Sequence, residues 1–474
     1  MSKLSLLDLA FFIAETPASP KHVAGLLILK RPPGSRAGFA KALYQEMLTR
    51  TDVQAPFDRI IDFPLAGMPR WLACPDFDLG RHLHYHKLKA GQNSRSALYA
   101  LAAKLHEEPL ERSKPLWEVH MIDGLPGGEF AIYNKLHHAV ADGVTMTRWM
   151  ADALDKTAEG HPLRPLWTVR HLRSGKAAEV NWRSLLATVG GAGKHAFGVS
   201  RLAAMLLLES VKLTKNAIAL PFVASGDTPL TGQVTQGRQF AATSVALDRI
   251  ARIRTETRST LNHVALTCLD GALHRYLADQ QVALERPITI QMPVNLRREG
   301  DTSAGNKIGI VQVELSAPTD DPYVRLRNIG FSLRNVRTMI DSVAPEAITS
   351  YSLMTGLAGQ LVEMFKLSDT FPPLGNTLVS NVPGPAKHLY MGGARLEEMH
   401  PISTLPPSNL LNITLFSYAG RLYFGLTASD ALPNLERLAD YVGEAFDELE
   451  QPILYPWGQT RQLDKSGTDP KRCA

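Results

Sequence analysis

The sequence is poor in cysteine and has no long apolar run. Its three cysteines among 474 residues are Cys74, Cys268 and Cys473. Their spacing matches neither a metal motif nor a set of disulfides, so we predict reduced thiols in a cytoplasmic protein. No stretch of about 18 uninterrupted apolar residues occurs, so no membrane-spanning helix is predicted. A Gly-x-Ser-x-Gly segment is also missing, which argues against a serine nucleophile on a strand-to-helix turn.

Charge of neither sign dominates. The chain has 51 Lys and Arg against 46 Asp and Glu, a formal net charge of +5. No nucleic-acid partner is predicted from so small an excess, although it suits a polyanionic ligand or an anionic membrane surface. Residues 1–8 carry charge within their apolar run and have no small-residue cleavage site, so we interpret them as mature protein rather than a signal peptide.

The composition is that of a globular protein, with 45% hydrophobic and 20% charged residues. The length predicts two domains, and strand-like segments alternating with helix-like ones predict an α/β fold with a cleft between two layered domains. We expect an N-terminal domain over residues 1–155, a linker over 156–231, a C-terminal domain over 232–455 and a tail over 456–474. Strands are predicted at residues 23–29, 118–122, 130–136, 288–294, 308–315, 377–385, 411–418 and 421–428, and helices at 39–50, 143–154, 261–280 and 435–449.

The linker contains a long helical pattern, residues 183–219, whose charges fall in one stripe. This stripe comprises Lys194, Arg201, Glu209, Lys212 and Lys215. The broad apolar face predicts either a bridging helix that packs on the two domains or a helix that contacts lipid. Residues 191–196 resemble a phosphate loop only superficially, because no strand precedes them and His195 stands where Ser or Thr is needed.

The most informative segment is residues 136–143, in which His137 and His138 are followed by Asp142 and Gly143. Adjacent strand residues point to opposite faces, so one histidine faces the cleft and the other is expected in the core. For the same reason the pair is not expected to share an ion, and no metal site is predicted. The histidine in the cleft offers a general base that titrates near neutral pH.

Asp142 has two interpretations. It is either the partner of this base or the N-cap of the helix predicted to begin at Gly143, where free backbone N–H groups stabilise a carboxylate. If Asp142 pairs with an arginine, Arg297 is the candidate, because it follows a predicted strand that should end near the cleft. The alternative for Arg297 is a solvated loop charge.

Residues 136–143 resemble the signature of the CoA-dependent acyltransferase superfamily. That resemblance implies two chloramphenicol-acetyltransferase-like mixed-sheet domains, an interdomain tunnel and a histidine that deprotonates the acyl acceptor. Further segments resemble the bacterial wax ester synthase/diacylglycerol acyltransferase family over nearly the whole chain. These segments are residues 4–8, 115–118 (Pro-Leu-Trp-Glu), 229–232, 293–297 and 380–385 (Ser-Asn-Val-Pro-Gly-Pro).

The resemblance implies that His138 is the general base. It also implies that a long-chain acyl group moves from acyl-CoA to the hydroxyl of a long-chain alcohol or a diacylglycerol. Acyl-CoA is then a substrate, and no cofactor, metal or covalent enzyme intermediate is required. The developing oxyanion needs hydrogen-bond donors. Ser380 or Asn381 is the candidate donor, and a purely structural turn is the alternative.

The sequence departs from the family pattern at the start of one helix, where Asn262 is followed by His263 instead of an acid. Only Asn262 is therefore carried over as a candidate. The small residues Gly356 and Gly359 predict either room for an alkyl chain in the tunnel or close helix packing. Poorly soluble substrates predict a peripheral protein at a membrane or lipid inclusion. Two alternatives are an enzyme that uses carrier-bound acyl groups and a non-catalytic lipid-surface protein.

Overall fold

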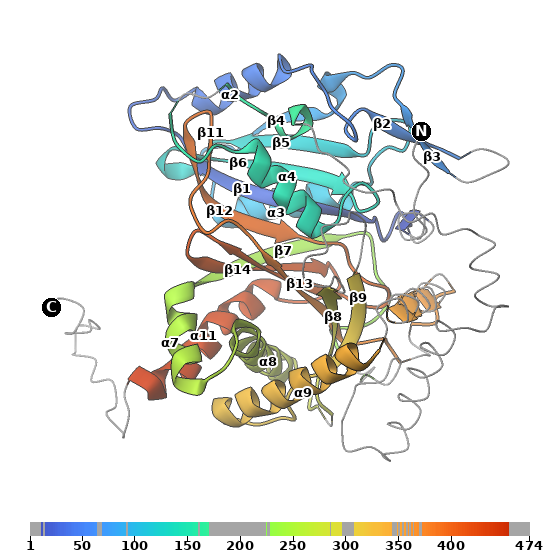
Figure 1. Ribbon diagram of the computed structural model, residues 1–474, viewed down its shortest axis with the longest axis vertical. Coiled ribbons are helices and arrows are strands. Elements are labelled where there is room, and N and C mark those ends of the chain that lie inside the picture. Colours follow the sequence, from blue (N-terminus) through green and yellow to red (C-terminus); the bar gives the residue numbers. More distant parts are fainter. Residues whose placement is uncertain are drawn as a thin grey trace.

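Two six-stranded mixed sheets form the frame of the protein, seen in a computed structural model (Figure 1). The structure describes residues 11–12, 15–63, 69–91, 93–159, 162–169, 224, 228–284, 286–295, 308–343, 348, 351–352, 355–356, 359, 362–363, 365–368 and 372–454. The long helix predicted at 183–219, the tail at 456–474 and Arg297 lie outside these residues. Within them, no helix combines the length and apolarity needed to cross a membrane.

The first sheet has the strand order β11-β12-β1-β6-β5-β4. These strands are β11 (Tyr390–Met391), β12 (Ala394–Ile402), β1 (His22–Lys30), β6 (Glu129–His137), β5 (Trp117–Asp123) and β4 (Leu83–Lys87). β1 and β6 pair antiparallel at the centre, with His22 opposite His137. The end of β6 therefore lies beside the start of β1, which fixes where the chain enters the segment with the two histidines.

Helices cover both faces of the first sheet because its strands are apolar on both sides. On one face lie α2 (Phe39–Leu48) and α4 (Gly143–Ala153), whose buried residues join those of β1, β5 and β6 in one core. On the other face lies α3 (Arg95–Glu107). Smaller elements complete this half. They are β2 (Arg59–Asp62), β3 (Arg70–Ala73) and the 3-10 turns Leu79–Arg81, Pro126–Gly128 and Leu166–Thr168.

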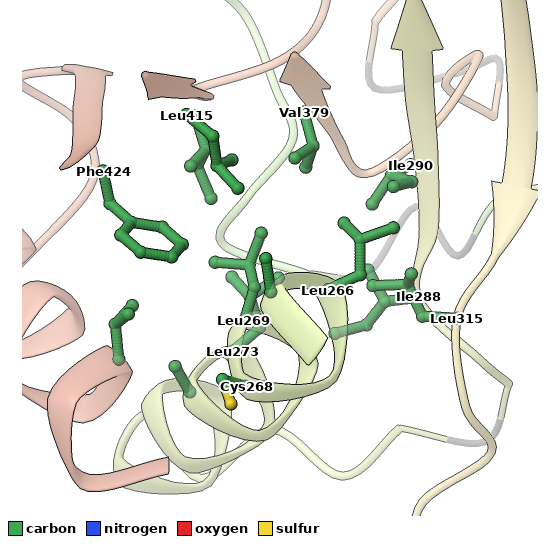
Figure 2. Close-up of a cluster of buried hydrophobic side chains, with 14 of the residues drawn as sticks. Leu266, Cys268, Leu269, Leu273, Ile288, Ile290, Leu315, Val379, Leu415 and Phe424 are labelled. Carbon is green, nitrogen blue, oxygen red and sulfur yellow. The ribbon is translucent and has the colours of Figure 1, made fainter. Parts of the chain in front are cut away.

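The second sheet has the order β7-β14-β13-β10-β8-β9. Its strands are β7 (Arg238–Ala246), β14 (Arg421–Ser429), β13 (Leu411–Tyr418), β10 (Thr377–Pro383), β8 (Thr289–Asn295) and β9 (Ile308–Glu314). Four helices gather on one side of it in Figure 1, namely α7 (Leu247–Thr257), α8 (Leu261–Asp279), α9 (Pro322–Ser342) and α11 (Leu435–Leu454). Figure 2 shows Leu266, Leu269 and Leu273 of α8 among side chains of the sheet, in a large apolar core.

The two sheets meet where β14 crosses β12. A Cβ on Gly425 would lie 2.1 Å from the carbonyl oxygen of Pro401, so this approach requires glycine. α3 also bridges the halves, since the ring of Tyr99 lies edge-on to Phe240 of β7 at 5.2 Å. Strands β11 and β12 come from the range predicted as the C-terminal domain, yet they pair within the first sheet. The first half is thus completed by chain from the predicted C-terminal range.

Most predicted elements are present with small shifts in their ends. The strands predicted at 130–136 and 118–122 are β6 and β5, and they pair antiparallel as a hairpin. Those predicted at 411–418 and 421–428 are β13 and β14. The mixed α/β architecture expected from the sequence is confirmed. The sequence analysis named no element at α3, β7, α7, α9 or β12.

Candidate active site

The segment with the two histidines is a short turn between β6 and α4. Backbone hydrogen bonds fix it from both sides: the His137 N–H donates to the Leu116 carbonyl at 3.0 Å, and the His138 N–H donates to the Lys21 carbonyl at 2.8 Å. The Val140 N–H then closes the turn on the His137 carbonyl at 2.9 Å. We call residues 137–142 the histidine turn.

Asp142 is the N-cap of α4, as the capping interpretation predicted. Its Oδ1 accepts the Thr145 N–H at 2.7 Å, and Asp142 has the extended backbone expected of a cap. Across the residues that the structure places, no hydrogen bond joins this carboxylate to the ring of His138, and no arginine pairs with it. Arg297, the partner expected from the sequence, lies outside those residues, so that pairing stays a prediction.

His138 is half-buried, and its ring stacks on Phe11 with centroids 4.0 Å apart. Its Nδ1 atom is buried. Burial lowers the pKa of His138 to about 4, against the attraction of the Asp142 carboxylate. The imidazole is therefore neutral at pH 7, which is the state that a general base requires.

His137 has a different environment. Its side chain is fully buried and stacks on Phe12, with ring centroids 4.3 Å apart. Its Nδ1 accepts the Ala139 N–H at 3.1 Å, and its Nε2 lies 3.4 Å from Oε1 of Glu15. The expectation that one histidine of the pair belongs to the core agrees with this placement.

Three charged residues surround the histidine turn, namely Glu15, Lys21 and Arg112. None of the three was predicted from the sequence. Glu15 lies 97 positions before Arg112, to which its Oε2 is bound at 2.8 Å. No spacing rule connects residues so far apart, and an isolated acid near a chain end carries no motif. The one available signal was the Phe11-Phe12 doublet, which predicts that this part of the chain packs against something apolar.

The late motif at residues 380–385 spans the end of β10, beside the start of α4. A Cβ on Gly143 would lie 3.8 Å from Cγ2 of Val382. The neighbouring Asn381 donates from Nδ2 to Oδ1 of Asn262 at 2.7 Å, so two predicted residues from distant segments are in contact. Ser380 donates from its hydroxyl to Thr414 on β13 at 3.0 Å.

The first turn of α8 contains Asn262 and His263. Its N-cap, Thr260, accepts the His263 N–H at 3.2 Å. Burial and the nearby Arg334 guanidinium lower the pKa of His263, so the residue that replaces the acid of the family pattern is neutral at pH 7. Its ring packs near Gly330 of α9.

The two glycines predicted near the tunnel differ. A Cβ on Gly359 would lie 2.9 Å from Cδ1 of Leu374, which agrees with close packing. A Cβ on Gly356 would meet no atom within 4 Å. A tunnel lined by these residues stays a prediction.

One group of described residues has the composition of a metal site. His84, Glu118 and His120 bring their ligand atoms within 4.8 Å of one another. However, the Glu118 carboxylate is already neutralised, because Lys114 and Lys135 each place an ammonium 3.2 Å from one of its oxygens. A cation there would face two ammonium groups, so the set does not fit a metal. We assign it to a structural network.

The comparisons with known proteins agree with this geometry. The model of the wax ester synthase/diacylglycerol acyltransferase catalytic domain matches residues 4–265, and that of the C-terminal domain of the same family matches residues 304–450. A putative diacylglycerol O-acyltransferase of Mycobacterium tuberculosis H37Rv is 32% identical over 460 residues, which is 95% of this chain and 100% of that protein.

Solved structures show the same architecture. The wax ester synthase/diacylglycerol acyltransferase from Marinobacter aquaeolei VT8 aligns with a TM-score of 0.74 and 27% identity, over 95% of this chain and 99% of that one. The first condensation domain of the calcium-dependent antibiotic synthetase shares the fold alone, at 13% identity and a TM-score of 0.60 over 96% of each chain. This chain therefore belongs to the wax ester synthase/diacylglycerol acyltransferase family.

Proposed function

We propose that this protein transfers a long-chain acyl group from acyl-CoA to the hydroxyl of a long-chain alcohol or a diacylglycerol, giving a wax ester or a triacylglycerol. The observation that carries the proposal is the neutral, half-buried imidazole of His138, held by the histidine turn at the start of α4. The family and the likeness to the Marinobacter structure support the same chemistry.

His138 acts as the general base. Because Nδ1 is buried, Nε2 is the nitrogen available to a substrate. It removes the proton of the acceptor hydroxyl as the oxygen attacks the thioester carbon, which forms a tetrahedral oxyanion. Collapse of this intermediate breaks the carbon–sulfur bond, and the departing thiolate of CoA takes the proton back from His138. Acyl-CoA is a substrate in this scheme, and neither a cofactor nor a covalent enzyme intermediate is needed.

The amides of Asn262 and Asn381 are the proposed oxyanion donors. Asn381 donates one side-chain N–H to Oδ1 of Asn262. Among the described residues, no partner binds its second N–H or the two N–H groups of Asn262. Ser380 is less suited, because its hydroxyl proton is directed at Thr414. The position of Gly143 against Val382 places this strand next to the histidine turn.

His138→Ala should abolish ester formation, with a loss of about 10²–10⁴-fold in kcat, because the base is removed. His137→Ala should cost less, since its side chain has no exposed nitrogen to offer. The assay uses the purified protein with palmitoyl-CoA and a panel of alcohols and diacylglycerols, follows CoA release and separates the lipid products. His86→Ala, on the edge strand β4, is the control and should keep the wild-type rate.

The same assay decides between the alternatives. Equal activity of His138→Ala and wild type would remove the proposed mechanism. Activity with carrier-bound acyl groups alone would favour the condensation-type enzyme. Binding to lipid vesicles with no turnover of any acceptor would favour a non-catalytic protein that coats lipid surfaces.

The protein is further proposed to work peripherally at a membrane or a lipid inclusion. The supporting observation is the sequence of the linker, whose basic residues share one stripe beside a wide apolar face. These basic residues are Lys194, Arg201, Lys212 and Lys215. Reversing all four to Glu should weaken flotation with anionic vesicles at low salt while turnover of a short soluble alcohol is kept. Failure of the wild type to float with such vesicles would overturn this localisation.

A further inference from the structure

The chain before β1 lies against the histidine turn. Two consecutive phenylalanines stack on two consecutive histidines, Phe11 on His138 at 4.0 Å and Phe12 on His137 at 4.3 Å, with interplanar angles of 18° and 15°. A flat aromatic contact restricts the rotation of each imidazole. The rings alone do not fix which nitrogen carries the proton, and that choice depends on polar neighbours.

Glu15 is the polar neighbour at this place, and it is almost wholly covered. Its side chain is 7% exposed. Its Oε1 lies 3.4 Å from Nε2 of His137 and accepts the Lys21 N–H at 3.1 Å. Its Oε2 is bound by the Arg112 guanidinium at 2.8 Å, and the same guanidinium donates to the Phe12 carbonyl at 3.3 Å. One carboxylate thus contacts the end of β6, the entry to β1 and the loop before β5.

The tautomer of His137 follows from these contacts. Nδ1 accepts the N–H of Ala139, so it carries no proton. The ring proton is therefore on Nε2, the atom that faces Glu15. Burial opposes ionisation of Glu15, but the close contact with His137 and the hydrogen bonds from Arg112 and Lys21 outweigh it and lower its pKa to about 2. The carboxylate stays charged across the working pH range.

We propose that Glu15 is a positioning residue of the acyl transfer, which holds His137 in the Nε2–H tautomer and thereby fixes the backbone that presents His138. Two routes connect Glu15 to the base. Through His137, it supports the Nδ1 bond that closes the turn at Ala139. Through the Lys21 N–H, it holds the residue whose carbonyl binds the His138 N–H at 2.8 Å. The inference rests on the proposed function of His138 as the base.

The kinetic test compares Glu15→Ala and Glu15→Gln with wild type, using palmitoyl-CoA and the best acceptor. Displacing the base by a fraction of an ångström should lower kcat about 100-fold in Glu15→Ala, with KM for palmitoyl-CoA changed by less than about 2-fold. Glu15→Gln keeps an acceptor for the Nε2 proton and should recover kcat to within about 10-fold of wild type. A folded Glu15→Ala with wild-type kcat would overturn the proposal.

Glu111→Ala is the matched control. Glu111 is an exposed carboxylate next to Arg112 in sequence, it pairs with Arg81, and among the described residues it contacts neither histidine of the turn. Its removal should leave kcat and KM at wild-type values. If Glu15→Ala fails to fold, Arg112→Ala gives a second test, because it frees Oε2 of Glu15 while Oε1 stays bound to Lys21. A loss of about 10-fold in kcat is expected in Arg112→Ala, and a wild-type kcat in that variant would overturn the proposal.

Nitrogen NMR of the protein with ¹⁵N-labelled histidine provides a readout that does not depend on activity. Wild type should show His137, assigned by its loss in His137→Ala, with a proton on Nε2 and none on Nδ1. Glu15→Ala should show a mixture of tautomers, and a proton on Nδ1 in wild type would overturn the proposal. If the wild type transfers acyl groups to no acceptor, the proposed function fails while this spectrum still decides the role of Glu15.

Discussion

The two halves of the protein have sheets of the same size but different interiors. In the second half, α8 packs against its sheet through apolar side chains alone over most of its length (Figure 2). In the first half, the sheet face beneath α3 carries buried polar groups as well as apolar ones. On the strands these groups are His22, His120 and Lys135, and α3 itself adds the buried His106. The same sheet architecture therefore tolerates two kinds of interior.

The polar groups of the first half satisfy the buried end of α3. The last carbonyls of a helix lack intrahelical partners and need donors. Nζ of Lys135 binds the carbonyls of Leu105 and Glu108 at 3.0 and 2.9 Å, and Nε2 of His22 lies 2.7 Å from the carbonyl of His106. The helix end is thus covered by protein donors in place of water, and a purely apolar strand face would leave those carbonyls unpaired.

Among the buried residues of α8, one is charged. Asp270 of α8 is fully buried, and its Oδ2 lies 3.2 Å from Nε of Arg325 on α9. Glu118 in the first half is shared between two lysines and a histidine, whereas Asp270 depends mainly on one guanidinium. A polar network therefore distributes its charge over several partners, while a pair in an apolar core does not.

The largest effect is expected from pH, because several imidazoles of the first half titrate together. Burial lowers the pKa of His82, His120 and His138 to about 4 and that of His106 to about 3. The unfolded chain binds protons from about pH 6.5 downward, so stability is full above pH 6.5 and is lost as pH falls toward 4. Urea unfolding followed by tryptophan fluorescence should show a lower midpoint at pH 5 than at pH 7.

Fluorescence is suited to this test because the tryptophans that the structure places, Trp71, Trp117, Trp149 and Trp167, all lie in the first half. Between pH 7 and pH 8 these histidines stay neutral in the folded state and are mostly neutral in the unfolded chain, so their contribution to the midpoint should change little. Equal midpoints at pH 5 and pH 7 would show that the first half has no special sensitivity to acid, and the contrast between the halves would fail.

The next effect contrasts the isolated pair with the network. Arg325→Met should lower the free energy of unfolding by about 3–5 kcal/mol, because it leaves the Asp270 carboxyl, whose pKa burial already raises to about 8, buried without its partner. Lys135→Met should cost less, about 1–3 kcal/mol, since Glu118 keeps Lys114 and only the carbonyls at the end of α3 lose a donor. Urea unfolding monitored by far-UV circular dichroism measures both values.

Exposed basic residues on the same helices are the controls. Arg327→Met on α9 and Lys104→Met on α3 remove the same charge without a buried partner, and each should change stability by less than about 0.5 kcal/mol. If Lys135→Met were as costly as Arg325→Met, the network would give no protection and the two interiors would be energetically alike.

Local patterns predicted the parts of the site that are contiguous in sequence. The apolar stretch at residues 130–134 marks a strand, and Asp142 before Gly143 marks a helix start, so β6, α4 and the cap could be located. The contact between Asn262 and Asn381 joins segments 119 positions apart, and neither segment contains a signal for the other. The family resemblance identified the two residues as candidates, but their contact could be seen only in the folded structure.

The sequence by itself determined the mixed α/β class, the hairpins and the histidine turn, because each depends on residues within a few positions of one another. Only the tertiary structure decided that β12 joins the first sheet, that Glu15 faces His137, and that burial keeps His138 neutral. The physical reason is that burial and charge pairing depend on which distant segments pack together. A carboxylate such as Glu15 gains its role from neighbours that the chain supplies only after it has folded.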